Sequence, residues 1–260
     1  MHYTTGQPHT SAGELHSYSL RTGQETRVET GVSRIVWVDR SDDLLLVMQR
    51  PQRKYGPHDL VLHGPGGATR ELASMVISYA VGHDGKRFYV VSSSFKQKTG
   101  GLSVVDLPAG TSKVLDFRAR GVTASSHSGW VAVLTDPVKS PPRSLDGQSS
   151  TYEDSYTCWL ISPTGKKTMV AKGVLMGSLQ FTAHGRLVFL SRTDQSVAPQ
   201  VSSVALAAPQ KTVKLARLLR HETDNSYWTN YKISRDGRWI VAQGLNVSRK
   251  AKELYTISTE

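Results

Sequence analysis

Apolar and polar residues alternate in short runs along the chain, and small polar turns separate these runs. The segment ISRDGRWIVAQ, residues 233–243, places one apolar run before an Asp-Gly pair and a second run after it. Because glycine readily adopts the positive φ that a tight turn needs, this pattern predicts a β-hairpin. No convincing amphipathic helix pattern occurs, so we expect an all-β protein.

The same turn and following strand recur along the chain. Their turn residues are Asp43, Gly85, Gly129, Gly185 and Gly237, at steps of 42, 44, 56 and 52 residues. A second apolar pair separated by a turn follows in each of four units, in residues 59–72, 101–116, 157–171 and 202–216. Four strands per unit and a period of about 40–50 residues are typical of β-propeller blades.

The turn with its strand resembles the short repeat of TolB-like β-propellers, relatives of WD-repeat proteins, whose pattern is roughly apolar-Ser-Pro-Asp-Gly-Lys-x-apolar-apolar. The residues that fit it are Ser234, Asp236, Gly237 and Arg238, and Asp84, Gly85 and Lys86. The residues that stand where the family usually has proline are Arg235, His83 and His127. The resemblance covers about residues 30–260 and implies a propeller fold, which by itself selects no activity.

The strands fit five or six four-stranded blades in one domain over residues 1–260. Two N-terminal strands, near residues 14–20 and 25–29, precede four complete units, and three strands near Tyr231, Trp239 and Tyr255 follow them. The last blade then lacks its outermost strand. The segment QETRVE, residues 24–29, could supply that strand and close five blades. The alternative is six blades with an incomplete first blade.

One set of loops carries a net charge of +5, out of +11 for the whole chain. Connections from the second to the third strand of a blade open on the face opposite the repeat turns. Here those segments carry eleven cations and six acidic residues. The cations are Arg50, Arg53, Lys54, Lys96, Lys98, Lys139, Arg143, Arg192, Arg249, Lys250 and Lys252. We therefore expect a positive face that attracts an acidic protein or a polyanion.

Several partner classes suit such a face. Aromatic side chains suited to base stacking lie in or beside the loops: Tyr55, Phe95, Tyr152 and Tyr156. No recognised nucleic-acid-binding motif accompanies them. Two further contact segments are the inserted loop 136–155 and the pair Tyr227 and Trp228, which precedes an innermost strand near the mouth of the central channel.

One cluster on this face could provide acid/base groups or metal ligands for catalysis. It consists of His58, His221, Glu222 and Asp224. Some TolB-like propellers are polysaccharide lyases that use histidines and a metal, so the resemblance implies, as an alternative, a metal-dependent enzyme acting on an anionic polysaccharide. The sequence contains no G-x-S-x-G nucleophile motif and no histidine spacing typical of a metal site. The preferred interpretation is a non-catalytic binding module without metal or cofactor.

The single cysteine, Cys158, excludes an internal disulfide, and its apolar strand predicts a buried, inert thiol. No run reaches the roughly 20 apolar residues of a membrane span. The N-terminus lacks the apolar core of a signal peptide. We therefore expect a cytoplasmic location if the chain is complete, and a periplasmic or secreted one if an export segment has been removed.

Overall fold

The structure is a computed structural model. It describes residues 2–5, 13–38, 45–49, 58–64, 68–93, 99–107, 109–138, 155–192, 200–217, 231–234, 238–246 and 251–258. These residues form antiparallel strands and turns, which confirms the all-β prediction, and none of them belongs to a helix that could cross a membrane. The chain divides into two compact units, residues 1–79 with 85–117 and residues 80–84 with 118–260.

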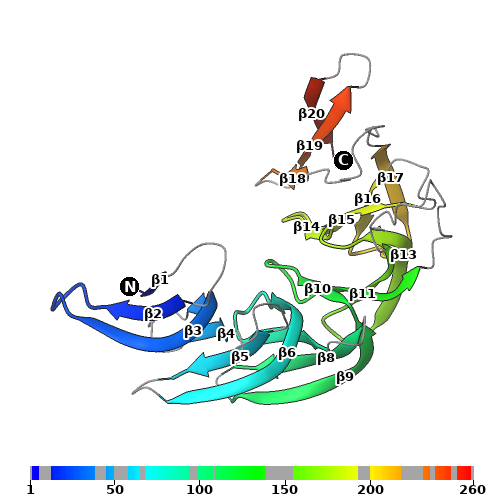
Figure 1. Cartoon of the computed structure of the whole chain (residues 1–260). Coiled ribbons are helices and arrows are strands. Elements are labelled where there is room, and N and C mark those ends of the chain that lie inside the picture. The colour runs from blue at the N-terminus through cyan, green and yellow to red at the C-terminus, as the bar shows by residue number, and fades with distance from the viewer. Residues whose placement is uncertain are drawn as a thin grey trace, which may run out of the picture. The chain divides into compact units, whose positions relative to one another are not determined.

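The first sheet contains nine strands that pair in chain order (Figure 1). They are β1 (His2–Thr5), β2 (Gly13–Tyr18), β3 (Glu25–Val38), β4 (Leu45–Gln49), β5 (His58–His63), β6 (Thr69–Val81), β7 (Arg87–Ser92), β8 (Gly100–Asp106) and β9 (Thr111–Ala119).

A second sheet of eight strands and a third of three belong to the C-terminal part of the chain. The second contains β10 (Gly121–Ala124), β11 (Val131–Val138), β12 (Ser155–Ile161), β13 (Lys167–Leu175), β14 (Gln180–Phe181), β15 (Arg186–Ser191), β16 (Gln200–Ala205) and β17 (Thr212–Arg217). The third contains β18 (Tyr231–Ile233), β19 (Trp239–Asn246) and β20 (Ala251–Ser258).

Two of the three described repeat turns have the same construction in different parts of the chain, and the third, at Gly129, lacks the positive φ. Gly85, between β6 and β7, and Gly185, between β14 and β15, have positive φ of 66° and 68°. After the next hairpin the chain bonds back to each turn, because Leu107 N–H donates to the Lys86 carbonyl at 2.7 Å and Leu206 N–H to the Gly185 carbonyl at 2.9 Å. Gly129 lies between β10 and β11, while Asp43 and Gly237 lie outside the described residues.

Three strands continue from one repeat into the next. The first parts of β3, β6 and β13 pair with the preceding strands β2, β5 and β12. The last parts of β3 and β13 pair with β4 and β15 of the next repeat. Each contains a residue with positive φ: Gly31 at 72°, Met75 at 55° and Gly173 at 76°. The alternation of apolar and polar residues did not predict such continuous strands. The positive φ turns the backbone, so one segment serves as the outermost strand of one repeat and the innermost strand of the next.

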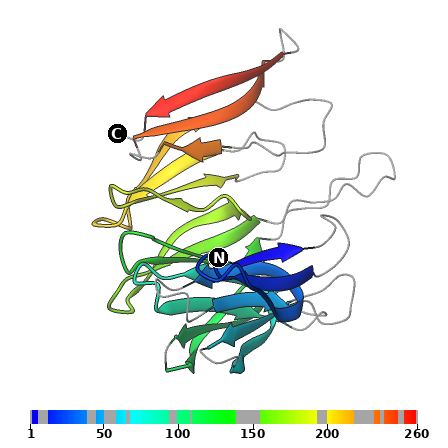
Figure 2. The ribbon, with the colours of Figure 1, turned by 90° about the vertical axis from the view of Figure 1, so that its left-hand side faces the viewer.

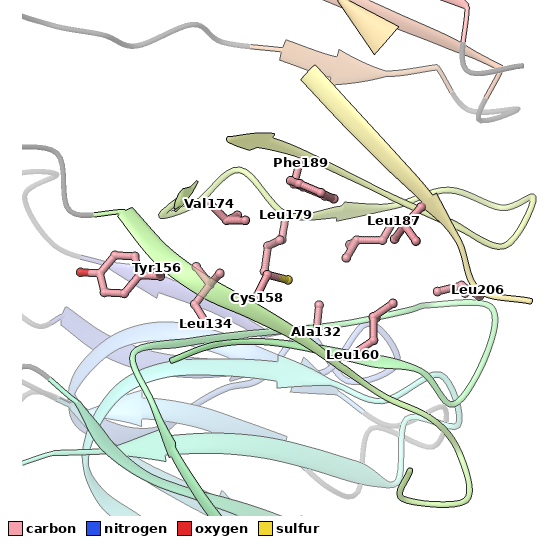
Figure 3. Close-up of a cluster of buried hydrophobic side chains, with 11 residues drawn as sticks. Ala132, Leu134, Tyr156, Cys158, Leu160, Val174, Leu179, Leu187, Phe189 and Leu206 are labelled. Carbon is pink, nitrogen blue, oxygen red and sulfur yellow. The ribbon is translucent and has the colours of Figure 1, made fainter. Parts of the chain in front are cut away.

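The largest described core cluster lies in the second sheet (Figure 3). Leu134 of β11, Cys158 and Leu160 of β12, and Leu187 and Phe189 of β15 are buried in it. A second cluster joins Val201 of β16 to Ile240 of β19, so one face of the β18–β20 sheet packs against the neighbouring repeat. Aliphatic residues on alternating strand positions provide these contacts, as expected for stacked sheets.

The N-terminal strand has a different partner from the one we expected. Residues 25–29, within QETRVE, belong to β3 and pair with β2, through Ser17–Thr26 and His16–Arg27 among others. A tight turn joins the two strands, with Ser19 N–H donating to the Gln24 carbonyl at 2.9 Å. This local hairpin therefore occupies the segment assigned by sequence to closing the last blade, because a short connection costs little entropy to close.

Candidate functional site

The candidate site is the set of predicted cationic loops, each considered within its own repeat. These connections join β4 to β5, β7 to β8, β11 to β12, β15 to β16 and β19 to β20, so each occupies the same step of its repeat. Within its repeat, each of two continuous strands contacts the start of such a loop: Met75 of β6 accepts a hydrogen bond from Ser93 N–H, directly after β7, at 3.0 Å. Gly173 of β13 accepts one from Arg192 N–H, directly after β15, at 2.9 Å.

Most of the predicted binding residues lie outside the described residues. They are Arg50, Arg53, Lys54, Lys96, Lys98, Arg143, Tyr227, Trp228, Arg249 and Lys250. The inserted loop 136–155 is described only at its ends, where β11 extends to Val138 and β12 begins at Ser155. The contribution of these residues to binding stays a prediction.

Of the eleven predicted cations, Arg192 is the one whose side chain lies among the described residues, and Lys252 is described only as part of the backbone of β20. The Arg192 side chain is 6% exposed, so it does not face solvent as an open loop residue would. The backbone bond to Gly173 holds Arg192 against the continuous strand β13, which explains its burial at the first position after β15. Arg192 also takes part in further interactions within the fold.

Of the predicted acid/base cluster, only His58 is described, and His221, Glu222 and Asp224 lie outside the described residues. His58 begins β5, is half-buried and pairs with Val76. The next residue, Asp59, has a structural role, because its Oδ1 accepts a hydrogen bond from Met75 N–H at 3.2 Å. This bond supports the positive φ of Met75, an unusual conformation for a residue other than glycine.

His63 lies at the opposite end of β5 from His58, so the two imidazoles do not form a pair. It is buried, and its Nε2 lies 3.9 Å from Oε2 of Glu29. Burial lowers the pKa of His63 below 6.5, and the Glu29 carboxylate opposes part of that change. Across the described ranges, no three His, Cys, Asp or Glu residues are grouped so as to hold a metal ion.

One polar cluster was missed by the sequence analysis. The imidazole of His16 on β2 lies between two carboxylates, with Nε2 at 3.3 Å from Glu14 Oε2 and Nδ1 at 2.7 Å from Glu25 Oε1. Arg27 Nη1 on β3 lies 3.4 Å from Glu14 Oε1. The register of the β2–β3 hairpin brings these groups together, and that register depends on bulges that the alternation pattern does not reveal.

No protein-family model matches this sequence, and no curated protein matches it. Similar solved structures include TolB from Acinetobacter baumannii, at 12% identity and a TM-score of 0.51, with 97% of this chain and 58% of that chain covered. The β-propeller domain of the trilobed protease from Pyrococcus furiosus has 10% identity and a TM-score of 0.54, with 100% of this chain and 79% of that chain covered.

Prolyl oligopeptidase B from Galerina marginata is also similar, with 12% identity and a TM-score of 0.55, and the alignment covers 98% of this chain and 38% of that chain. The chain thus spans just over half of the TolB chain and a smaller share of the peptidase. At such low identities the similarity shows the fold: the chain has a TolB-like β-propeller fold. Propellers serve different functions, so an activity has to be argued from the site.

Proposed function

We propose that this protein is a non-catalytic binding module that contacts an acidic protein or another polyanionic partner through the loops between the second and third strands of its repeats. The observation that carries the proposal is a charge difference between the two ends of the strands. The five connections, taken between the strand ends, contain ten cations and four acidic residues, a net charge of +6. The nine other turns of the same repeats contain six cations and five acidic residues, a net charge of +1.

This difference in net charge favours an anionic partner that binds the five connections. Clustered positive charge raises the local concentration of anions and their association rate, and salt weakens both effects. The burial of Arg192 removes one cation from the exposed set and leaves the excess in the connections at 50–57, 93–99 and 247–250. The positive charge selects anionic molecules as the class of partner. Contacts in those loops determine which acidic protein or polysaccharide binds.

The alternative is a metal-dependent enzyme that acts on an anionic polysaccharide. Such an enzyme needs His58 and other acid/base groups to lie within hydrogen-bond distance of a substrate in one pocket. The peptidases with similar folds are longer chains, and this sequence has no G-x-S-x-G motif. The alternative is therefore second, and the same experiment separates it from binding.

The test combines elemental analysis with thermal melts in polygalacturonate, heparin and single-stranded DNA, each at low and high salt. We expect no stoichiometric metal and a rise in Tm with at least one polyanion that high salt abolishes. A bound metal whose chelation lowers Tm would instead favour the enzyme, with a His58→Ala variant as the next measurement. Stabilisation that does not depend on salt would contradict a cationic contact surface.

A further inference from the structure

A chain of hydrogen bonds joins β5, β6 and the residue after β7, and it ends at one of the cationic connections. Asp59 Oδ1 of β5 accepts a bond from Met75 N–H of β6 at 3.2 Å. The Met75 carbonyl accepts one from Ser93 N–H at 3.0 Å, and Ser93 Oγ donates to the Thr99 carbonyl at 3.3 Å. All four residues belong to the first compact unit, in the cyan to green part of the ribbon in Figure 2.

The last of these bonds joins the two ends of the connection between β7 and β8. Ser93 and Thr99 flank residues 94–98, which include two lysines. Ser93 is buried, and a Cβ on Gly100 would lie only 3.0 Å from the Ser93 Cβ, so the two ends of the connection approach each other closely. The backbone of Ser93 therefore sets the base of this connection.

Met75 is the link in the chain that needs support. Its φ is 55°, and among the described residues it is the one non-glycine with positive φ. The two other continuous strands have Gly31 and Gly173 at the corresponding place, and the Gly173 carbonyl accepts the equivalent backbone bond. A side chain disfavours this conformation, so methionine needs a stabilising contact that glycine does not. The Asp59 carboxylate supplies that contact by accepting the Met75 N–H.

We propose that Asp59 is a positioning residue for the cationic connection after β7. By holding Met75 in its left-handed conformation, it fixes the base of the segment that carries Lys96 and Lys98. A fixed base reduces the conformational entropy that the two lysines lose when a polyanion binds them. Asp59 thus favours the binding of an anion although its own charge repels one. This role in binding rests on the proposed function, whereas the hydrogen-bond chain does not.

Two variants of Asp59 separate position from charge. Asp59→Asn and Asp59→Ala remove the same negative charge, but asparagine keeps an oxygen that can accept the Met75 N–H. Electrostatics alone predicts equal and slightly tighter heparin binding by both variants. We expect Asp59→Asn to bind heparin at least as tightly as the parent, and Asp59→Ala to have a Kd at least about threefold higher than that of Asp59→Asn. Equal Kd values for the two variants would overturn the proposal.

Two further backgrounds show whether the effect acts through Met75 and reaches the lysines. Glycine adopts positive φ without support, so adding Met75→Gly to Asp59→Ala should return the Kd to within about twofold of the Asp59→Asn value. In a Lys96→Ala/Lys98→Ala background, Asp59→Ala should no longer raise the Kd, because the connection has lost the charges that Asp59 positions. A loss of affinity that Met75→Gly does not restore, or that persists without the two lysines, would indicate a general effect on the fold and overturn the proposal.

Amide hydrogen exchange without ligand separates this proposal from the proposed function. The Ser93 N–H should exchange at least about tenfold faster in Asp59→Ala than in Asp59→Asn. The Arg192 N–H, which makes the equivalent bond to Gly173 in the second unit, should exchange alike in both. Equal exchange at Ser93 would overturn the proposal whether or not heparin binds. A parent that binds none of heparin, polygalacturonate and single-stranded DNA would overturn the proposed function, and the exchange at Ser93 would then decide on the hydrogen-bond chain by itself.

Discussion

A substitution at Gly173 tests whether β13 continues from one repeat into the next. Its φ of 76° is in the left-handed region, and a Cβ at this position would meet the carbonyl oxygen of Arg192 well inside van der Waals contact and its carbonyl carbon at 3.1 Å. Both atoms belong to the backbone and cannot swing away. Gly173→Ala must therefore distort the close approach at which Arg192 N–H donates to the Gly173 carbonyl.

Gly177→Ala is the matched control, because Gly177 has nearly the same φ, 75°, and no atom within 4 Å of its added Cβ. The left-handed conformation costs alanine about 1–2 kcal/mol, and the stiffer unfolded chain returns about 0.4–1 kcal/mol. The control should thus lose about 1 kcal/mol. Gly173→Ala adds a damaged buried hydrogen bond and a backbone shift, about 1–3 kcal/mol more.

Urea denaturation of the two variants and the parent measures this difference, and the free energy of unfolding should fall about 2 kcal/mol further for Gly173→Ala than for Gly177→Ala. Thermal melts should show the same order, at about 2–4 °C per kcal/mol for a chain of this size. Equal losses, within the scatter of about 0.5 kcal/mol for independent sites, would refute the close contact between β13 and the residue after β15.

Two titratable side chains give further predictions. Burial lowers the pKa of His63 below 6.5, so the unfolded chain binds a proton at this residue more readily than the folded chain. The free energy of unfolding should therefore fall as the pH drops below about 6.5. In urea denaturation, the free energies of unfolding at about pH 7.5 and 5.5 should differ less for His63→Asn than for the parent. An unchanged pH dependence would contradict the burial of His63. Burial raises the pKa of the Cys158 thiol to about 12, so a thiol reagent at about pH 8 should label it only in denaturant, and rapid labelling of the native protein would contradict its packing.

The strands and their turns were largely predictable, since both depend on local residues. The alternation of apolar residues identified the hairpins, and the glycines at 85 and 185 adopt the positive φ that their turns need. The partner of an edge strand was not predictable in the same way. Residues 25–29 could pair with any exposed edge, and a six-residue turn decided the outcome in favour of β2.

The loops that carry the predicted cations could be identified from the sequence, but the geometry around Arg192 could not. Sequence placed the cations in loops of one topological class, and the strand order supports that assignment of loops. It did not foresee that Arg192 would be buried, because the backbone bond from Arg192 to Gly173 links two repeats. It also missed Asp59, whose role depends on the strained backbone of Met75 and not on any motif.

The most direct measurement of the central claim is the salt dependence of heparin binding by two double variants. Lys96→Glu/Lys98→Glu reverses two charges in one cationic connection, while Lys166→Glu/Lys211→Glu reverses two exposed lysines in turns at the other end of the strands. We predict that the first pair raises Kd at least about tenfold and flattens the slope of log Kd against log salt concentration, because binding releases fewer counterions. The second pair should change neither the Kd nor the slope substantially. Equal effects of the two pairs, or heparin binding that is independent of salt, would contradict a cationic contact face, as would the absence of binding to heparin, polygalacturonate and single-stranded DNA alike.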